Sequence, residues 1–222
     1  MDVALRPGRC GSGYHVQRST SNAISFLAPG LVHQFGNLLL TIQGQALALA
    51  PHAVDRGREA ILTATDRGGA TLRLLRYLLG EPGGGVHDAA GLCEQFAEVA
   101  RVPVREAGYV LDWRPPHQTK AMPVDAGELI PLLTEGLRGL VLAIPAGAVG
   151  RVVLGCGTVD GMLCLRLQFQ PAAGSLPFPL ASEAAALAVA AAQRQHGWQG
   201  RCLPTPLGLE LQLPLADPTT EA

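Results

Sequence analysis

Residues 31–42 read Leu31-Val32-His33-Gln34-Phe35-Gly36-Asn37-Leu38-Leu39-Leu40-Thr41-Ile42. Large side chains in and around this stretch recur in alternating steps of four and three, which is the spacing of one stripe on an α-helix. The stripe consists of Leu27, Leu31, Gln34, Leu38, Ile42, Gln45 and Leu49. Pro29 requires that this helix either begins near Pro29 or kinks there. His33 lies about 200° from Leu31 around the helix, so we expect it to point away from the stripe.

The next segment carries a second stripe of the same kind. It consists of Ile61, Thr65, Gly68, Leu72, Leu75 and Leu79, with Asp55 as N-cap and Gly80 as C-terminal stop. Because the connection at 51–54 is short, the two helices must run antiparallel as a hairpin. Further leucines make the apolar face wider than one neighbouring helix can cover, namely Leu39, Leu40, Leu47, Leu62, Leu74 and Leu78. A second copy of the chain would cover them, so the sequence predicts a homodimer built on a four-helix bundle.

From residue 86 onward, short apolar runs alternate with helical patterns. We expect helices at Ala89–Ala100, Asp125–Leu142 and Glu183–Gln195, and strands at Val104–Asp112, Lys120–Val124, Arg151–Cys156, Met162–Gln170, Gln199–Leu203 and Gly208–Leu213. Strands interleaved with helices on one side form a two-layer α/β sandwich, so the chain as a whole is α+β. We expect a flexible arm at 1–22, a helical hairpin at 23–82 and the sandwich at 86–216, with the glycine-rich run near 80–85 as linker.

The composition excludes several classes of function. Of the 222 residues, 48% are hydrophobic and 16% are charged, which is typical of a chain that folds around a core. A net charge of −1 provides no basic surface for nucleic acid or for an anionic membrane. The apolar runs Leu140–Val149 and Ala184–Ala192 are shorter than the roughly 18–20 residues of a spanning helix, so we expect no membrane attachment. The N-terminus lacks the apolar core of a signal peptide, and the odd number of cysteines, without a C-x-x-C pair, predicts a reduced, cytoplasmic protein.

The stretch at 31–42 resembles the H-box of bacterial sensor histidine kinases, whose usual form is close to H-[DE]-F-N-N-L-L-T-x-I. Residues 124–133 resemble the aspartate-plus-helix opening of that family's ATP-binding domain, and residues 143–152 and 195–214 resemble later landmarks of the same domain. The likeness covers nearly everything after residue 25. It implies a dimerising hairpin that carries His33 as phosphoacceptor, followed by a sandwich of the histidine kinase ATPase type.

Several positions depart from what this resemblance implies for nucleotide binding. Glu135 and Gly139 occupy the positions of the asparagines that hold magnesium and the triphosphate. Residues 169–171 offer no carboxylate where an aspartate of the family recognises adenine. Ala184 and Ala186 replace glycines that cradle the phosphates, and methyl groups crowd such a cradle.

The departures predict a degenerate ATPase domain that uses neither ATP nor a metal as cofactor. Desolvating a triphosphate without magnesium ligands or backbone donors costs more free energy than apolar contacts return. Gln34 also follows His33 where autokinases of the family carry an acid that orients the imidazole. We therefore expect no ATP-dependent autokinase activity.

An imidazole needs no ATP site to accept a phosphoryl group, because its uncharged form is a nucleophile near neutral pH. The resemblance therefore predicts a histidine phosphotransferase of a two-component phosphorelay, in which His33 exchanges phosphoryl groups with response-regulator receiver domains. Gly36 would leave room for the partner, and Asn37 would hydrogen-bond the phosphoryl group or a water. Two alternatives remain at this point: a non-catalytic pseudokinase that binds a receiver or a kinase, and a receiver phosphatase in which Gln34 and Asn37 position water.

Other candidate residues have weaker patterns. The remaining histidines show no ligand spacing for zinc; they are His15, His52, His87, His117 and His196. Cys156 and Cys164 are expected as packed thiols rather than as a redox pair. Arg67, Arg73 and Arg76 are expected to form a solvated face, with docking of an acidic receiver as the alternative.

Overall fold

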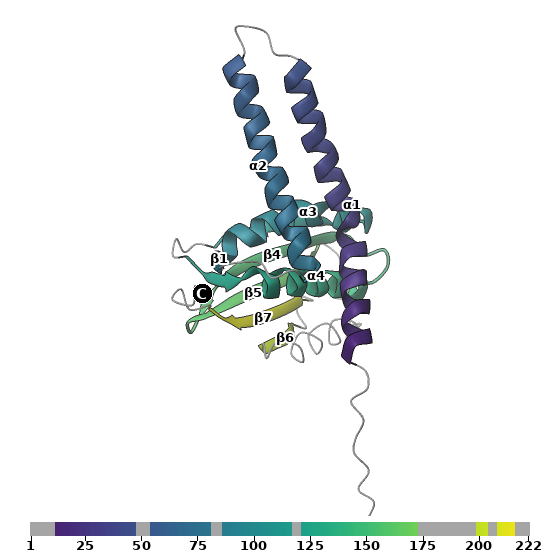
Figure 1. Cartoon of the computed structure of the whole chain (residues 1–222). Helices are drawn as coiled ribbons and strands as arrows, with labels where there is room; N and C mark the ends of the chain where they lie inside the picture. Colours follow the sequence, from purple (N-terminus) through teal and green to yellow (C-terminus); the bar gives the residue numbers. More distant parts are fainter. Residues whose placement is uncertain are drawn as a thin grey trace, which may run out of the picture.

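The computed structural model describes residues 12–47, 54–80, 86–116, 121–172, 199–203 and 208–215. The elements are α1 (Ser12–Leu47), α2 (Val54–Leu78), β1 (Val86–Asp88), α3 (Ala89–Glu106), β2 (Val110–Arg114), β3 (Pro123–Asp125), α4 (Ala126–Ala143), β4 (Gly150–Val159), β5 (Met162–Pro171), β6 (Gln199–Leu203) and β7 (Gly208–Pro214). Figure 1 shows α1 and α2 as a long antiparallel hairpin, with α3 and α4 between the hairpin and the sheet. The predicted α+β class, a helical hairpin followed by a two-layer α/β unit, is confirmed.

The first helix is longer than the sequence indicated. It begins at Ser12, so residues 12–22, which we expected in a flexible arm, are helical. Pro29 lies inside α1, which runs through it without ending. A proline in a helix interior removes one hydrogen bond and bends the axis. Of the two sequence alternatives, the kink is therefore the correct one, and the ribbon of α1 changes direction part-way along its length (Figure 1).

The sheet has five strands in the order β2-β4-β5-β7-β6. The β2–β4 pair is parallel and the other pairs are antiparallel. The β4–β5 hairpin closes through Asp160 and Gly161, whose φ angles of 52° and 76° are both left-handed. Two left-handed central residues are what a two-residue turn between twisted strands requires, and Asp-Gly is a favoured pair for it.

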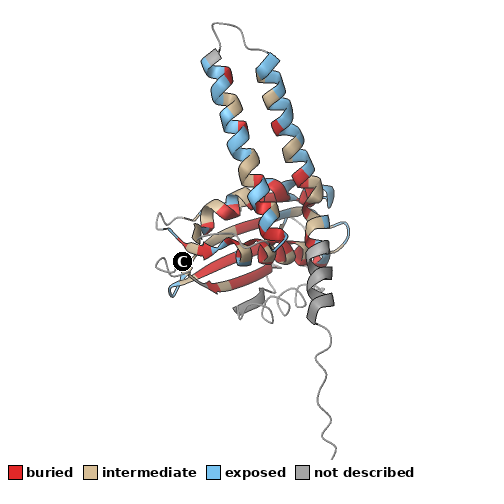
Figure 2. Ribbon diagram, viewed as in Figure 1, coloured by how far each residue is buried: buried red, intermediate tan, exposed pale blue. Residues whose placement is uncertain are grey.

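One continuous hydrophobic core joins the hairpin to the α/β unit. The inward-facing residues of the sheet pack against α3 and α4, with Phe96, Leu133 and Phe169 almost fully buried. The same core takes in side chains from the lower halves of α1 and α2, namely Ala23, Leu27, Leu31, Leu74, Tyr77 and Leu78. Figure 2 shows the buried residues concentrated there and the outer part of the hairpin largely exposed. The two parts that the sequence separated are thus packed against each other.

The strand expected at Val104–Asp112 is wrong in its first half. The helix α3 continues to Glu106, includes Pro103, and buries Val102 and Val104. Valines at alternate positions indicate a strand when read alone, but here they fill the space between α3 and its neighbours. The strand β2 begins only at Val110.

Asp88 and Asp125 each cap a helix of the α/β unit. The carboxylate of Asp88 accepts from Gly91 N at 3.2 Å and from Met122 N at 2.9 Å, so it joins the start of α3 to the segment before β3. Asp125 Oδ1 accepts from Gly127 N at 2.7 Å at the start of α4. The helix expected at 125–142 is confirmed, whereas the helix expected at 183–195 lies outside the described residues.

One segment among the described residues, Asn22–Leu47 of α1, is long and apolar enough to cross a membrane by length and composition. Polar residues such as His33, Gln34 and Asn37 interrupt it, so it contains no unbroken apolar run of that length. A helix that packs in the core of a soluble protein meets the same two criteria, and Leu27 and Leu31 of this segment are buried in the core.

Candidate functional site

His33 is exposed on α1, as the helical periodicity predicted. Its Nε2 lies 3.1 Å from the amide nitrogen of Asn37, one turn further along the helix. An amide nitrogen only donates, so this contact makes Nε2 the acceptor and places the ring proton on Nδ1. Asn37 itself is exposed. The hydrogen bond therefore positions the His33 ring at the surface of the hairpin.

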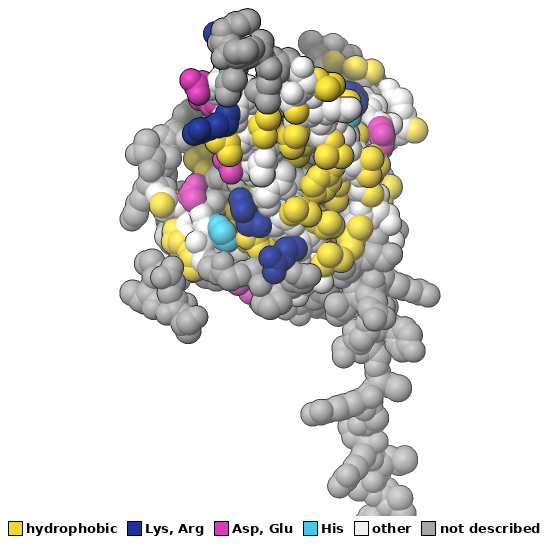
Figure 3. Space-filling view, turned by 45° about the horizontal axis from the view of Figure 1, so that its top comes forward, with side chains coloured by type: hydrophobic (Ala, Val, Ile, Leu, Met, Phe, Trp, Pro, Cys, Tyr) yellow, Lys and Arg dark blue, Asp and Glu magenta, His cyan; other side chains and the backbone are white. Residues whose placement is uncertain are grey.

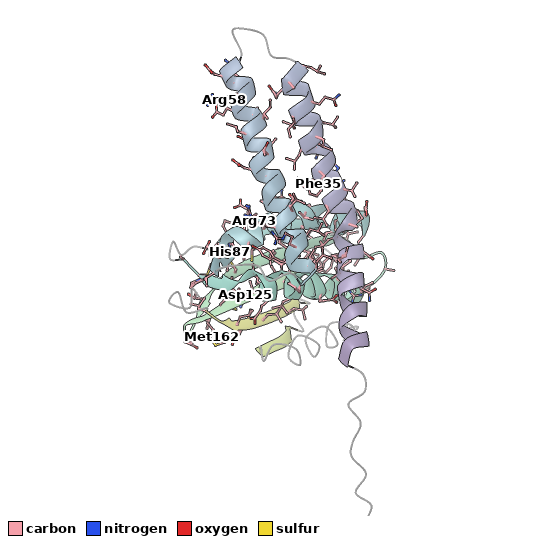
Figure 4. The ribbon with its side chains drawn as sticks, viewed as in Figure 1. Phe35, Arg58, Arg73, His87, Asp125 and Met162 are labelled. Atoms are coloured by element: carbon pink, nitrogen blue, oxygen red, sulfur yellow. The ribbon has the colours of Figure 1, made fainter. Side chains whose placement is uncertain are left out.

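The residues on either side of His33 have different surroundings. Gly36 is exposed, and a Cβ added there would meet no atom within 4 Å. Gln34 is half-buried and points toward α3, where its amide nitrogen donates to the carbonyl oxygen of Glu98 at 3.3 Å. Gly36 thus leaves open space on this side of α1, whereas Gln34 links α1 to α3. Figure 4 shows Phe35, two positions after His33, on α1 near the level at which the hairpin rises from the α/β unit.

His33 opens onto a groove of about 520 Å³ between the hairpin and the α/β unit. We call it the His33 groove. Its lining residues are His33, Gln34, Asn37, Leu38 and Thr41 of α1, Arg67 of α2, Glu98, Arg101, Val102 and Arg105 of α3, and Tyr109, Val110 and Leu111 at the start of β2. The groove is therefore built from four elements, and two of them belong to the α/β unit.

Sequence reasoning missed the two arginines that α3 contributes. Arg101 and Arg105 are exposed and lie four residues apart, so they share one face of α3. Of the three arginines that the sequence singled out on α2, only Arg67 lines the groove. No local pattern marks Arg101 or Arg105, because their position beside His33 depends on how α3 packs against α1.

A glycine allows that packing. A Cβ added at Gly30 would overlap the carbonyl group of Val99, so the backbones of α1 and α3 touch at this point. Gly30 lies one helical turn before His33, and Val99 lies two residues before Arg101. The close approach, together with the bond from Gln34 to Glu98, fixes the two helices beside the imidazole.

The positions that the resemblance assigns to nucleotide binding are engaged otherwise. Glu135 pairs with Arg138, whose Nη2 lies 2.8 Å from its Oε2. Gly139 is buried in α4 and has no side-chain ligand atom. Gln170 Oε1 accepts from Arg114 Nη2 at 3.2 Å and from Arg151 Nε at 3.3 Å. Ala184 and Ala186 lie outside the described residues.

The cysteines and histidines form no metal site in the part of the chain that the structure describes. Cys156 and Cys164 lie on the two strands of the β4–β5 hairpin but face opposite sides of the sheet. Cys156 pairs with Leu165, the residue after Cys164, and neighbouring residues of a strand point to opposite faces. Cys156 instead contacts Cys93 of α3, and the hydrogen bond between these thiols, together with burial, raises the pKa of Cys93 well above its usual range. His87 lies in a different environment from His33, 3.0 Å from the Tyr77 hydroxyl.

No family model and no curated protein sequence matches this chain. Solved structures do match. The histidine kinase AdeS of Acinetobacter baumannii matches at 9% identity and a TM-score of 0.42, over 83% of this chain and 98% of that one. A structure described as a bacterial phosphotransferase matches at 14% identity and a TM-score of 0.38, over 93% and 98%. The blue-light activated histidine kinase EL346 of Erythrobacter litoralis matches at 13% identity and a TM-score of 0.43, over 85% and 60%.

The structures that this chain is similar to are thus histidine kinases and a phosphotransferase. Their identities and TM-scores are too low to assign an activity.

Proposed function

We propose that this chain is a histidine phosphotransferase of a two-component phosphorelay, which exchanges phosphoryl groups between His33 and the phospho-aspartate of receiver domains. The observation that carries the proposal is the exposed His33 imidazole, whose Nε2 accepts a hydrogen bond from Asn37 at the edge of an open groove. In this proposal the chain acts as a cytoplasmic homodimer and does not phosphorylate itself from ATP.

In the proposed transfer, His33 and the phospho-aspartate account for every bond that forms or breaks. The Nε2 lone pair of His33 attacks phosphorus in line with the carboxylate oxygen of the phospho-aspartate. The N–P bond forms as the P–O bond breaks, the carboxylate leaves with the electron pair, and Nδ1 keeps its proton. The Asn37 amide, released from Nε2, can donate to a phosphoryl oxygen. The reverse reaction passes the group to a second receiver, and the receiver supplies the magnesium.

The absence of autokinase activity in this proposal is supported by the α/β unit. Glu135 is held by Arg138 in place of a magnesium-binding amide, and Gly139 offers no ligand atom. The hairpin and the α/β unit also share one core, so no part of the α/β unit can swing toward His33 without exposing buried side chains. Both observations support a proposal in which His33 receives its phosphoryl group from another protein.

The test is incubation of the chain with a panel of phosphorylated receiver domains from the same genome. We expect a phosphate label that is stable to base, labile to acid and located on His33 by peptide mapping. His33→Gln should abolish the label and leave the circular dichroism spectrum unchanged, because the side chain is exposed. His87→Gln is the matched control, because it removes an imidazole outside the His33 groove and should retain the label.

Three results would contradict the proposal. Labelling by ATP alone would show an autokinase. Release of inorganic phosphate from the receiver without any phosphohistidine would show the phosphatase alternative. A stable complex with a receiver that survives His33→Gln and never transfers would show the interaction module.

A further inference from the structure

The His33 groove is lined by more basic than acidic side chains. Arg67, Arg101 and Arg105 line it, and Glu98 is the one carboxylate among its lining residues. No carboxylate among the described residues lies within ion-pairing distance of these three guanidinium groups. The groove therefore carries arginines that no described side chain neutralises.

The geometry points to a composite docking site in which Arg101 and Arg105 of α3, with Arg67 of α2, bind the acidic surface around the phosphorylated aspartate of a receiver domain. This inference rests on the proposed function and deepens it, because it assigns part of the transfer site to the α/β unit. It also gives that unit a role that requires no nucleotide.

The size of the groove favours side chains of a partner over a free anion. Its volume of about 520 Å³ is several times that of a phosphoryl group, so a phosphate alone would fill only part of it. An acidic protein surface complements three arginines that have no described ion-pair partner. Arginines pair with carboxylates through two parallel hydrogen bonds, and three of them at separate points of one groove would fix the orientation of such a surface.

The arginines of α3 are held in place relative to His33. The backbone contact between Gly30 and Val99 and the hydrogen bond from Gln34 to Glu98 join α1 to α3 next to the groove. A receiver bound by Arg101 and Arg105 would therefore meet the imidazole at a fixed distance. Fixed positioning of two reactants is a main source of rate in a group transfer.

The experiment compares two phosphodonors on the same variants. One donor is a phosphorylated receiver domain that labels the wild-type chain, and the other is phosphoramidate, a small donor that has no acidic surface. In the reaction with phosphoramidate, its P–N bond breaks, ammonia leaves and the N–P bond forms at His33. The variants are Arg101→Ala with Arg105→Ala, the same pair changed to lysine, and Arg73→Ala. Arg73 is the matched control, because it is exposed on α2 but does not line the groove (Figure 4).

We expect the double alanine variant to lose at least tenfold in the initial rate of transfer from the receiver and to change less than twofold with phosphoramidate. The lysine pair should recover part of the receiver rate, and Arg73→Ala should match wild type. Raising the salt from about 0.05 M to about 0.5 M should slow the wild-type receiver reaction more than that of the alanine variant. Salt screens the attraction between the arginines and the receiver, and the alanine variant has already lost two of these arginines.

Two outcomes overturn the docking site. Receiver transfer at the wild-type rate in the double alanine variant would show that α3 takes no part. An equal loss with both donors would show that the arginines act on the phosphoryl group rather than on the partner. If no receiver labels the wild-type chain at all while phosphoramidate does, the proposed function itself fails, and that result is distinct from both.

Discussion

At the scale of single residues, the hydrogen bond between Asn37 and His33 determines which ring nitrogen is available for chemistry. The contact of 3.1 Å requires an unprotonated Nε2. In the proposed transfer, the Asn37 amide positions the imidazole and then donates to the incoming phosphoryl group. The helical spacing of four residues makes this pairing predictable from the sequence.

Two substitutions of Asn37 should therefore differ in their effects. Asn37→Ala removes a positioning contact and should slow phosphoryl uptake by His33 about three- to tenfold, the equivalent of about 1 kcal/mol. Asn37→Asp should slow it further, because a carboxylate accepts from a protonated Nε2 and repels the phosphoryl oxygens. Initial rates with a phosphorylated receiver, together with the imidazole tautomer from nitrogen NMR, check both. Equal rates in the two variants would contradict this role for the amide.

The residues that could be predicted are those whose environment is local. His33, Gly36 and Asn37 share an exposed helix face, and the helix period alone shows it. The positions of Arg101 and Arg105 beside His33 depend on a contact between segments about seventy residues apart in the chain. No spacing rule within α3 reveals such a contact, so the sequence could not add them to the site.

At the scale of elements, the crossing of α1 and α3 is the contact that builds the His33 groove. It depends on Gly30, because any larger side chain would overlap the backbone of Val99. Glycine inside a helix costs about 0.5–1 kcal/mol relative to alanine, so its presence indicates a steric requirement. The neighbouring Pro29 predicted either a helix start or a kink, whereas no sequence pattern marked Gly30.

Gly30→Ala should destabilise the protein by about 1–3 kcal/mol, because the added methyl group forces the two helices apart. Gly44→Ala is the matched control on the same helix, since a Cβ there meets nothing within 4 Å. It should leave stability unchanged or raise it by up to about 1 kcal/mol through helix propensity. Urea unfolding followed by circular dichroism measures both. Gly30→Ala with wild-type stability would show that α1 and α3 are not in backbone contact.

The elements that the sequence predicted well are those with a complete local signal. The helix α4 has Asp125 as N-cap and a strong apolar stripe, and the strands expected at 151–156 and 162–170 lie within β4 and β5. The strand β1 and the last six residues of α3, 101–106, were missed. The three residues of β1 pair only with the three residues of β3. The valines of α3 are helical because they pack in the core, although valine alone favours a strand.

At the scale of the whole molecule, the outer part of the hairpin exposes a large apolar surface. Its exposed side chains include Val32, Leu39, Leu40, Leu47 and Leu62, with Leu47 81% exposed. Figure 3 shows hydrophobic side chains gathered in a broad patch on one face of the molecule. Val32 and Leu39 lie about 100–120° from His33 around α1, so a second copy could cover them and leave the imidazole accessible.

We therefore expect a dimer in solution, with twice the chain mass of 23.2 kDa by light scattering at micromolar concentration. Leu39→Glu should shift the mass toward the monomer, because each subunit of a symmetric dimer would place the charge in the apolar interface. Leu142→Glu is the control, since Leu142 is 64% exposed on α4, outside the hairpin. A monomeric wild type, or equal effects of the two substitutions, would contradict the dimer.

The common core has a kinetic consequence for the proposed relay. If the common core keeps the α/β unit away from His33, as the proposed function holds, each turnover would begin and end with a collision between two separate proteins. The flux through the chain would then follow the concentrations of its donor and acceptor and the balance of their phosphorylation, and would not respond to the cellular supply of nucleotide. Phosphoryl groups could pass in either direction, toward whichever receiver has the lower phosphorylated fraction at that moment.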